Sequence, residues 1–528
     1  MIRKSIYAAL LCSSAFAISG TAFAQDPAPQ AEPTEPDASD TTADAAIAEA
    51  QPVDELQSKI ELLQAQVEAL QDALEGVKAA QVKTTPSWKG APLFEDKEAG
   101  WSFKPRGRLQ FDVGFVGNPD DDIVTRNLGF NTRARRIRIG VEGTIPGGFG
   151  YKAEADFANS SVGFGDVIIT YAPAGKPFNF TIGNHETLNG LEQVSSSRFL
   201  SFVERAAFDD AFINTRRIGL SAGYANKANT FRFNAGLFSA HTIDSSLDND
   251  GWIGAARATY SPLMGANQLH FGASYQHRNF QSNNGATVNA QTAGEPSANQ
   301  RVRYRARPFS QLTDQRFVNT DFFAAKSDDI FGLEFAGIFK SLHIAAEGQY
   351  IVANAYGRGD TLVAGTDPLD LFSTSSVFVP TGNPSFWGGY AEVGYYFTGE
   401  TRGYKNGLWD RTKVLKPFSK GGWGALQLNG RVDYLDLDSD RLKNGCTNNF
   451  VTGVCTGAPV LSKGGKQLGF LASLVWIPED YMRFYLQYSH AQITGGPFAA
   501  TVESTSSKPI DERKYGSDTV AARAQIDF

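Results

Sequence analysis

The chain has 528 residues, of which 42% are hydrophobic and 20% are charged, and its formal net charge is -7. With 53 glycines and 12% aromatic residues, it has ample apolar surface to bury, which excludes a disordered chain. Beyond the first two dozen residues, no stretch approaches the roughly 18 consecutive apolar residues that a membrane-spanning helix requires. If this chain crosses a membrane, it must do so with strands.

The N-terminus has the three parts of a secretory signal peptide, which we predict over residues 1–24. Two basic residues at 3–4 precede an apolar run at 6–18, and an Ala-Phe-Ala cleavage site occupies positions 22–24. We therefore expect the protein to be exported.

Residues 25–52 are rich in Pro, Ala and acidic residues, which indicates a disordered linker. Residues 53–80 then repeat apolar residues at alternating spacings of three and four, the heptad pattern of a short α-helical coiled coil. Residues 81–100 form a second linker. Between positions 26 and 83 there are thirteen acidic residues and three lysines, a net charge of -10, so the body of the chain is almost neutral. The heptad seam consists of Val53, Leu56, Ile60, Leu63, Val67, Leu70, Leu74 and Val77.

The positions that flank this seam are mostly glutamine. Because these side chains are uncharged, they discriminate little between partner helices. Association of the helix with further copies of itself is the simplest expectation. β-Branched residues at position a with Leu at position d favour a parallel dimer. A single amphipathic helix lying on another surface is the alternative.

Residues 101–528 are dominated by strict alternation of apolar and polar residues. In residues 136–142, for example, Ile137, Ile139 and Val141 share one face while charged residues and a glycine share the other. Sixteen segments fit this pattern, with short connections alternating with longer ones. We therefore predict an all-β fold, a 16-stranded antiparallel transmembrane β-barrel with a water-filled interior, in the bacterial outer membrane. A soluble β-sandwich or β-helix also alternates and is the alternative.

Several segments resemble the phosphate-selective porins O and P. They read NTRARRIRIGVEGTIPGGFGYKAEADFA, YRARPFSQLTDQRFVNT, GGYAEVGYYFTGETRGY, GGWGALQLNGRVDYLDLDSD and the closing AARAQIDF. The resemblance covers most of residues 101–528. It implies a trimeric barrel that passes small anions, in some members phosphate, through a pore lined by arginines and narrowed by a third loop that folds inward.

Strand parity places a set of basic residues on the polar face, where they would select anions and offer bidentate forks to phosphate. Arg133 and Arg135 have the opposite parity, so either they lie beyond the bilayer or a β-bulge redirects them. Five arginines between positions 301 and 316 would either collect anions at the mouth or bind lipopolysaccharide. The expected pore-lining residues are Arg108, Arg136, Arg138, Lys152, Arg217, Arg232, Arg257, Arg278, Arg431, Arg483 and Arg523.

The expected constriction loop, residues 186–210, departs from the family pattern. It contains Arg198, Arg205, Glu192 and Glu204 but no lysine, whereas the phosphate-preferring members place a lysine cluster at the narrowest point. Phosphate preference is therefore not predicted from this loop. A separate set of acidic residues on the polar face could form a negative wall: Glu142, Glu154, Asp156, Glu334, Glu347, Glu392 and Asp433.

After removal of the signal peptide, Cys446 and Cys455 are the remaining cysteines, and an exported protein can join them in a disulfide; two thiols in a loop are the alternative. The expected function is a passive channel for small anions such as phosphate. The alternative is a structural tether, in which the coiled coil links the membrane to the cell wall or a periplasmic partner. Lipid, lipopolysaccharide and further copies of the chain are the expected contacts. No enzymatic activity, cofactor, metal or nucleic acid is expected.

Overall fold

The computed structural model describes most of the chain from Val53 onward. The signal peptide, the linker 25–52 and Cys455 lie outside the described residues, so the signal peptide and the Cys446–Cys455 disulfide stay predictions. The described residues are 53–84, 87–88, 90–119, 128–158, 162–212, 215–240, 242–243, 251–280, 301–320, 322–355, 380, 382–442, 444–446, 459–461, 463–499, 501–502 and 507–528.

The heptad segment is a single helix, α1 (Val53–Thr84). It is rich in Ala, Leu, Gln and Glu, the residues with high helix propensity. Its seam residues are exposed in the isolated chain, for example Leu63 at 59% and Leu70 at 69%. The helix is therefore observed, whereas its pairing into a coiled coil stays a prediction. Within the described part of the chain, no helix is long and apolar enough to span a membrane.

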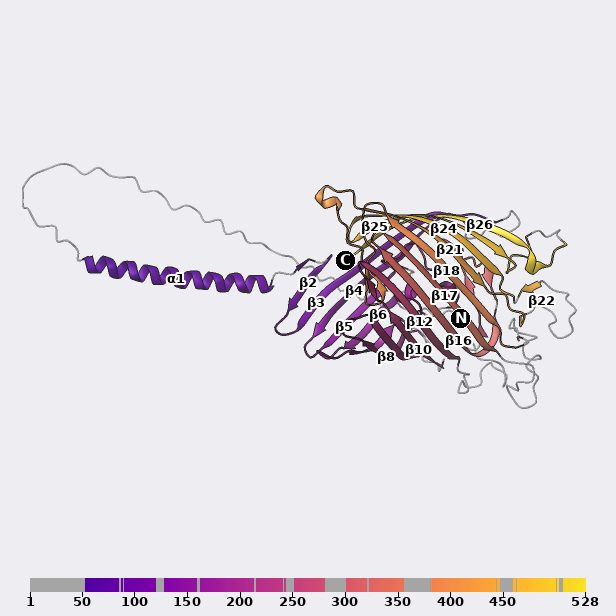
Figure 1. The fold of residues 1–528 in the computed structure, drawn as a ribbon, viewed down its shortest axis with the longest axis horizontal. Coiled ribbons are helices and arrows are strands. Elements are labelled where there is room, and N and C mark those ends of the chain that lie inside the picture. Colours follow the sequence, from indigo (N-terminus) through magenta and orange to yellow (C-terminus); the bar gives the residue numbers. More distant parts are fainter. Residues whose placement is uncertain are drawn as a thin grey trace, which may run out of the picture. The chain divides into compact units, whose positions relative to one another are not determined.

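Sixteen long strands of the described chain form a closed antiparallel barrel (Figure 1). Closure is made by Thr519–Asp527 of the last strand, which pairs with Arg108–Val116 of the first. The predicted barrel is confirmed. Its strands are β3 (Trp101–Val116), β4 (Gly129–Ile145), β5 (Phe149–Asp156), β6 (Gly163–Tyr171), β7 (Phe178–His185), β8 (Arg217–Ala225), β9 (Phe231–Ser239), β10 (Gly251–Tyr260), β12 (Asn267–Phe280), β16 (Phe323–Phe339), β17 (Leu342–Ala355), β18 (Ser385–Tyr396), β21 (Ala425–Asp436), β24 (Lys466–Glu479), β25 (Met482–Thr494) and β26 (Lys514–Asp527).

Shorter elements lie before the first of these strands or in the connections between them. They are β1 (Ser87–Trp88), β2 (Pro92–Asp96), α2 (Leu191–Val194), α3 (Ala207–Phe212), β11 (Leu263–Met264), β13 (Arg301–Val302), β14 (Arg305–Ala306), β15 (Val318–Asn319), β19 (Tyr404–Lys405), β20 (Leu408–Trp409), β22 (Asn444–Cys446), β23 (Pro459–Leu461) and the 3₁₀ turns η2 (Phe418–Lys420) and η3 (Ile510–Glu512). One end of the barrel has mostly tight turns, such as residues 340–341, and the other has the long loops.

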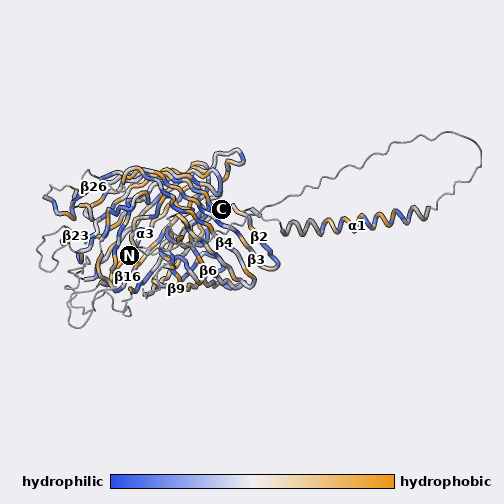
Figure 2. The backbone as a smooth tube through the Cα atoms, turned by 180° about the vertical axis from the view of Figure 1, so that it is seen from behind, coloured by the Kyte–Doolittle hydropathy of each residue, from blue (hydrophilic) through white to orange (hydrophobic). Residues whose placement is uncertain are grey.

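Hydrophilic and hydrophobic residues alternate along the barrel strands (Figure 2), and the exposed fractions of their side chains assign them to an outer and an inner face. On β3, Phe111 and Val113 are exposed to the outside, whereas Gln110 and Asp112 are turned inward and buried. The register shifts where Gln110 pairs with Arg136 and Phe111 with Ala134, which leaves Arg135 as the bulged residue. This β-bulge redirects Arg133 and Arg135 to the interior, where they contact the Gln311 carbonyl oxygen and the Glu204 carboxylate.

The interior is not empty, because three connections fold into it. These are residues 186–216, 301–322 and part of 397–424. Their apolar side chains pack against inward-facing residues of the strands, so the main hydrophobic core lies inside the barrel. This core includes Leu191, Phe202, Phe208, Phe212, Tyr304, Phe317, Phe386, Tyr390 and Trp409.

Candidate functional site

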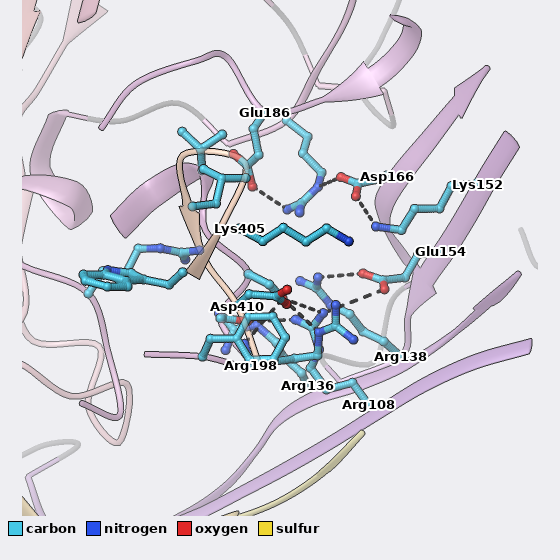
Figure 3. Close-up of a pocket in the computed structure, with 18 of the residues that line it drawn as sticks. Arg108, Arg136, Arg138, Lys152, Glu154, Asp166, Glu186, Arg198, Lys405 and Asp410 are labelled. Atoms are coloured by element: carbon cyan, nitrogen blue, oxygen red, sulfur yellow. Dashed lines mark hydrogen bonds and ion pairs between the residues drawn. The ribbon is translucent and has the colours of Figure 1, made fainter. Parts of the chain in front are cut away.

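A polar cavity of the interior lies against the strands β4, β5 and β6, which we call the near wall. Its volume is about 410 Å³ (Figure 3). The near wall supplies one side, the loop 186–216 a second, and the hairpin β19–β20 a third. The charged residues that line it are Arg108, Arg136, Arg138, Lys152, Glu154, Asp166, Glu186, Arg198, Arg205, Arg216, Lys405 and Asp410.

A second cavity of about 240 Å³ adjoins the first. The two share five lining residues, and the second is bounded by Arg307 and Gln311 of the long-loop connection 301–322. The two cavities therefore lie next to each other along the near wall, between the long-loop side and the hairpin. The shared residues are Arg136, Arg138, Glu186, Arg205 and Arg216.

Alternating ion pairs order the charges along the two cavities. Arg138 donates to Glu154 at 2.8 Å and to Asp156 at 2.7 Å. Arg216 bridges two carboxylates, Asp166 at 2.5 Å and Glu186 at 2.8 Å. Asp166 also accepts from Lys152. These pairs hold the long basic side chains in place along the cavity.

Two arginines of the cavity have mainly uncharged partners. Arg108 donates to the Ser197 hydroxyl at 2.8 Å, and its closest ion pair, with Glu154, is 3.9 Å long. Arg136 donates to the Gln110 amide oxygen at 2.7 Å and, within the described residues, forms no salt bridge. The Nε atoms of both guanidinium groups are buried without a hydrogen-bond partner in this part of the structure. Their positive charge is therefore weakly compensated.

A lysine does enter the cavity, but from a different connection than the third loop. Lys405 lies on the hairpin β19–β20 between β18 and β21, at the end of the barrel with the tight turns. Its side chain extends into the cavity, with the ammonium group directed toward the side where Lys152, Asp166 and Glu154 lie (Figure 3). The cavity therefore has a lysine from the hairpin, although residues 186–210 contain none.

Sequence reasoning missed four of these residues: Asp166, Arg216, Lys405 and Asp410. Parity selected Arg217, the first residue of β8, but its guanidinium donates to the carbonyl oxygens of Ala240 and Thr215. Arg216 precedes the strand, so strand parity does not apply to it. Lys405 and Asp410 lie in a connection that carries no alternation signal.

The third loop is held to the barrel by carboxylates of the strands. Glu347 accepts the backbone amides of Leu191 at 2.6 Å and Glu192 at 2.8 Å, at the start of α2. Asp433 accepts the amide of Ala207, the first residue of α3, at 3.2 Å. Both carboxylates belong to β10 through β21, which we call the far wall. Glu347 and Asp433, expected as part of a negative pore wall, instead fix the loop.

The predicted arginines of the far wall also pair with carboxylates. Arg257 makes a two-pronged pair with Glu334 at 2.7 and 2.8 Å, and Arg278 donates to Asp328 at 2.6 Å. Arg431 joins Glu192 of the third loop, at 2.5 Å, to Glu392 of the wall, at 2.6 Å. These three arginines face the interior as predicted, but they do not line the two cavities.

The other predicted positions have separate surroundings. Arg523 pairs with Asp112 at 2.6 Å and with Glu204 at 2.8 Å. Arg483 is buried, with its guanidinium carbon 5.6 Å from the centre of the Phe199 ring. Arg232 is half-buried and donates to Asn229. None of the three is among the residues lining the two cavities.

The third-loop residues divide into two groups. Arg198 and Arg205 line the cavity, whereas Glu192 is buried against Arg431. Burial, reinforced by Arg106, lowers the pKa of Arg198 to about 10, so it stays protonated at neutral pH. Burial alone would raise the pKa of Glu204, but Arg135 and Arg523 lower that pKa well below its usual range. Arg198 is therefore positively charged and Glu204 negatively charged at neutral pH.

The family model described as phosphate-selective porin O and P matches residues 103–497, more than half of the chain. An uncharacterized protein of Caulobacter vibrioides is 35% identical over 461 residues, covering 85% of this chain and 78% of that protein. Porin O of Pseudomonas aeruginosa is 26% identical over 369 residues, covering 66% of this chain and 75% of that protein.

Some solved structures are similar to this chain at low sequence identity. The anion-selective porin from Comamonas acidovorans is 11% identical with a TM-score of 0.43, and covers 81% of this chain and 100% of that one. The outer membrane channel DcaP of Acinetobacter baumannii is 13% identical with a TM-score of 0.43, and covers 82% of this chain and 99% of that one. The chain belongs to the family of phosphate-selective porins O and P and is a channel of the bacterial outer membrane.

Proposed function

We propose that this protein is a passive channel that prefers small anions. The observation that carries the proposal is the charge of the main cavity, whose lining has eight Arg or Lys side chains and four Asp or Glu side chains, a net of four positive charges. A water-filled passage with this lining lowers the electrostatic barrier for anions and raises it for cations.

The distribution of partners supports release as well as binding. Arg138, Lys152 and Arg216 are tied to carboxylates, which moderates their attraction for a passing anion. Arg108 and Arg136 are weakly compensated, so they are the stronger anion contacts. Conduction requires such graded binding, favourable enough for entry and weak enough for exit.

Phosphate is the anion that we propose as the preferred solute. Guanidinium groups offer bidentate hydrogen bonds to phosphate oxygens, and a lysine adds a compact positive charge. Arg136 and Lys405 line the same cavity, which supplies both kinds of group. The family description supports this choice.

The test is a reversal-potential measurement on the purified full-length protein in a planar bilayer. In asymmetric potassium chloride, we expect a potential of the sign that marks anion preference. Millimolar phosphate, added to the chloride solution at constant pH, should then reduce the chloride current, because the two anions compete for the channel. Cation preference in both salts would contradict the proposal.

We also propose a homotrimer whose subunits meet along β5 to β9. These strands have 8 or 9 residues, whereas β3 and β4 have 16 and 17. Eight residues at about 3.3 Å each, tilted by about 40°, reach only about 20 Å, less than the apolar band of about 25 Å. The large, well-exposed apolar side chains of these five strands are Phe, Ile and Leu, without the exposed Trp and Tyr that interfacial girdles use.

A second candidate function is tethering, and α1 favours it. A helix of 32 residues with an exposed apolar seam is suited to self-association or to a periplasmic partner, including the cell wall. Deleting residues 25–83 should then weaken envelope integrity in cells while leaving the single-channel conductance unchanged. A variant with normal integrity would rule out the tether and leave the channel proposal untouched.

A further inference from the structure

One stretch of the β18–β21 connection lies outside the barrel. Residues 413–423, which we call the rim elbow, contain η2 and project outward from the barrel end where the C-terminus lies (Figure 1). The Phe418 ring packs edge-on against Trp476 of the outer face, with ring centroids 6.2 Å apart. The Trp476 indole donates to the Trp423 carbonyl oxygen at 2.7 Å. The rim elbow is therefore continuous with the lipid-facing wall.

The rim elbow is firmly attached to its neighbours. Val414 is buried, and its backbone amide donates to the Asp480 carboxylate at 2.8 Å. The amide of Ser419 donates to Glu479 at 2.5 Å. Gly424 ends the elbow with φ of +78°, and a β-carbon there would lie 2.4 Å from the Ile477 carbonyl oxygen. The backbone of the rim elbow is therefore fixed, and it holds the elbow side chains in exposed positions.

Two kinds of side chain are displayed on this elbow. Three are large apolar side chains that are exposed on the surface: Leu415 at 58%, Phe418 at 57% and Trp423 at 83%. Three are exposed lysines that form no salt bridge within the described chain: Lys413, Lys416 and Lys420. Aromatic residues beside lysines are typical of the membrane–water boundary, where rings lie at headgroup depth and ammonium groups reach phosphates.

We propose that the rim elbow binds the headgroup of an anionic phospholipid in the periplasmic leaflet. The tight-turn end of an outer-membrane barrel is the periplasmic end, and the elbow lies at the ends of β24 and β25 there. Its lysines contact the headgroup phosphate, and Phe418 and Trp423 extend the aromatic boundary of the wall. This proposal depends on the outer-membrane location and not on the ion preference of the channel.

The connection also links this lipid site to the pore. Arg411, just before the elbow, donates to the Asp527 carboxylate and stacks over Tyr481 at 4.1 Å. The same connection carries Lys405 and Asp410 into the main cavity. A bound lipid therefore restrains one end of the segment that places Lys405.

The experiment measures lipid retained by the purified full-length protein, using native mass spectrometry after incubation with phosphatidylglycerol or phosphatidylcholine. The test variant carries Lys413→Gln, Lys416→Gln and Lys420→Gln. The matched control carries Lys176→Gln, Lys227→Gln and Lys340→Gln, three exposed lysines on other tight turns. We expect the test variant to retain phosphatidylglycerol at least about tenfold more weakly than the control, because each surface lysine strengthens anionic lipid binding several-fold.

A second variant, Phe418→Ser with Trp423→Ser, tests the apolar half of the site and should lower retention of both lipids. Equal retention of phosphatidylglycerol by the lysine variant and the wild-type protein would overturn the proposal. So would an equal loss in the control variant, or displacement of the lipid by inorganic phosphate at the same concentration. In a phosphatidylcholine bilayer the lysine variant should keep the wild-type reversal potential, which separates this result from the channel proposal.

Discussion

The near wall and the far wall use the same pairing of arginine with carboxylate for different purposes. On the near wall, Arg138 pairs with Glu154 and Asp156 and still lines the cavity. On the far wall, Arg431 is 3% exposed and lies between Glu192 of the third loop and Glu392 of the barrel. Near-wall pairs therefore shape a passage, whereas far-wall pairs anchor the loops that narrow it.

The difference follows from what covers each wall. Apolar side chains of the third loop, such as Phe202 and Phe208, pack into the interior core together with far-wall residues such as Tyr390. A charge under this layer is removed from water, so it must be paired. The near wall instead lines the two cavities, and Arg138 keeps 14% of its side chain exposed, so a passing anion can compete for its guanidinium group.

The largest expected effect breaks a far-wall anchor. Arg431→Met leaves Glu192 and Glu392 buried without their cation, and removing one partner of a buried pair costs about 3–5 kcal/mol. We expect a much lower temperature for unfolding of the barrel, measured by the heat-dependent mobility shift in gel electrophoresis. The matched near-wall variant, Arg138→Met, should shift that temperature far less. Equal shifts would remove the distinction between the walls.

The next effect concerns ion selectivity and the near wall. Arg136→Glu combined with Lys405→Glu changes the charge of the main cavity by four, from four positive charges to neutral, so the anion-to-cation permeability ratio should fall roughly tenfold or more. Reversal potentials in asymmetric chloride measure this ratio. Lys227→Glu with Lys176→Glu makes the same charge change on tight turns away from the cavity and should leave the ratio almost unchanged. A similar fall of the permeability ratio in this control would show that ion selectivity depends on the overall charge of the protein and not on the cavity lining.

A smaller effect tests the lysine supplied by the hairpin. Lys405→Gln should weaken phosphate block of the chloride current by about threefold to tenfold, because one charge-assisted contact is lost. The control is Lys416→Gln, on the same connection but on the rim elbow outside the barrel. An unchanged phosphate block in the Lys405 variant would show that phosphate binding in the channel does not depend on this lysine.

The smallest effect is a pH dependence of the third loop. The pKa of Glu204 is held below its ordinary value of 4.5 by Arg135 and Arg523, so the carboxylate stabilises the folded loop fully above about pH 4.5. That stabilisation is lost only as the pH falls below this value toward the lowered pKa. The contribution of Glu204 to the stability of the loop should therefore stay constant from pH 7 to about 4.5. The single-channel current of the Glu204→Gln variant should be noisy at all pH values, and a wild-type transition near pH 6 that this substitution abolishes would contradict the assignment.

The sequence alone determined the architecture of the barrel. Alternation with a period of two assigns each strand residue to one face, because successive side chains of a strand point to opposite sides. For this reason Arg108, Arg136 and Arg257 were correctly assigned to the interior. Turn lengths and the number of alternating segments then specified a closed sheet, since an open edge would leave backbone groups unpaired in lipid.

Tertiary structure decided which of these interior charges line the cavities. Parity cannot tell Arg138 from Arg431, because their difference lies in the loop packed above them. The bulge at Arg135 and the hairpin that brings Lys405 into the cavity are equally invisible to a period-two pattern. Contacts between residues far apart in the chain made these choices, and strand alternation constrains only neighbours along one strand.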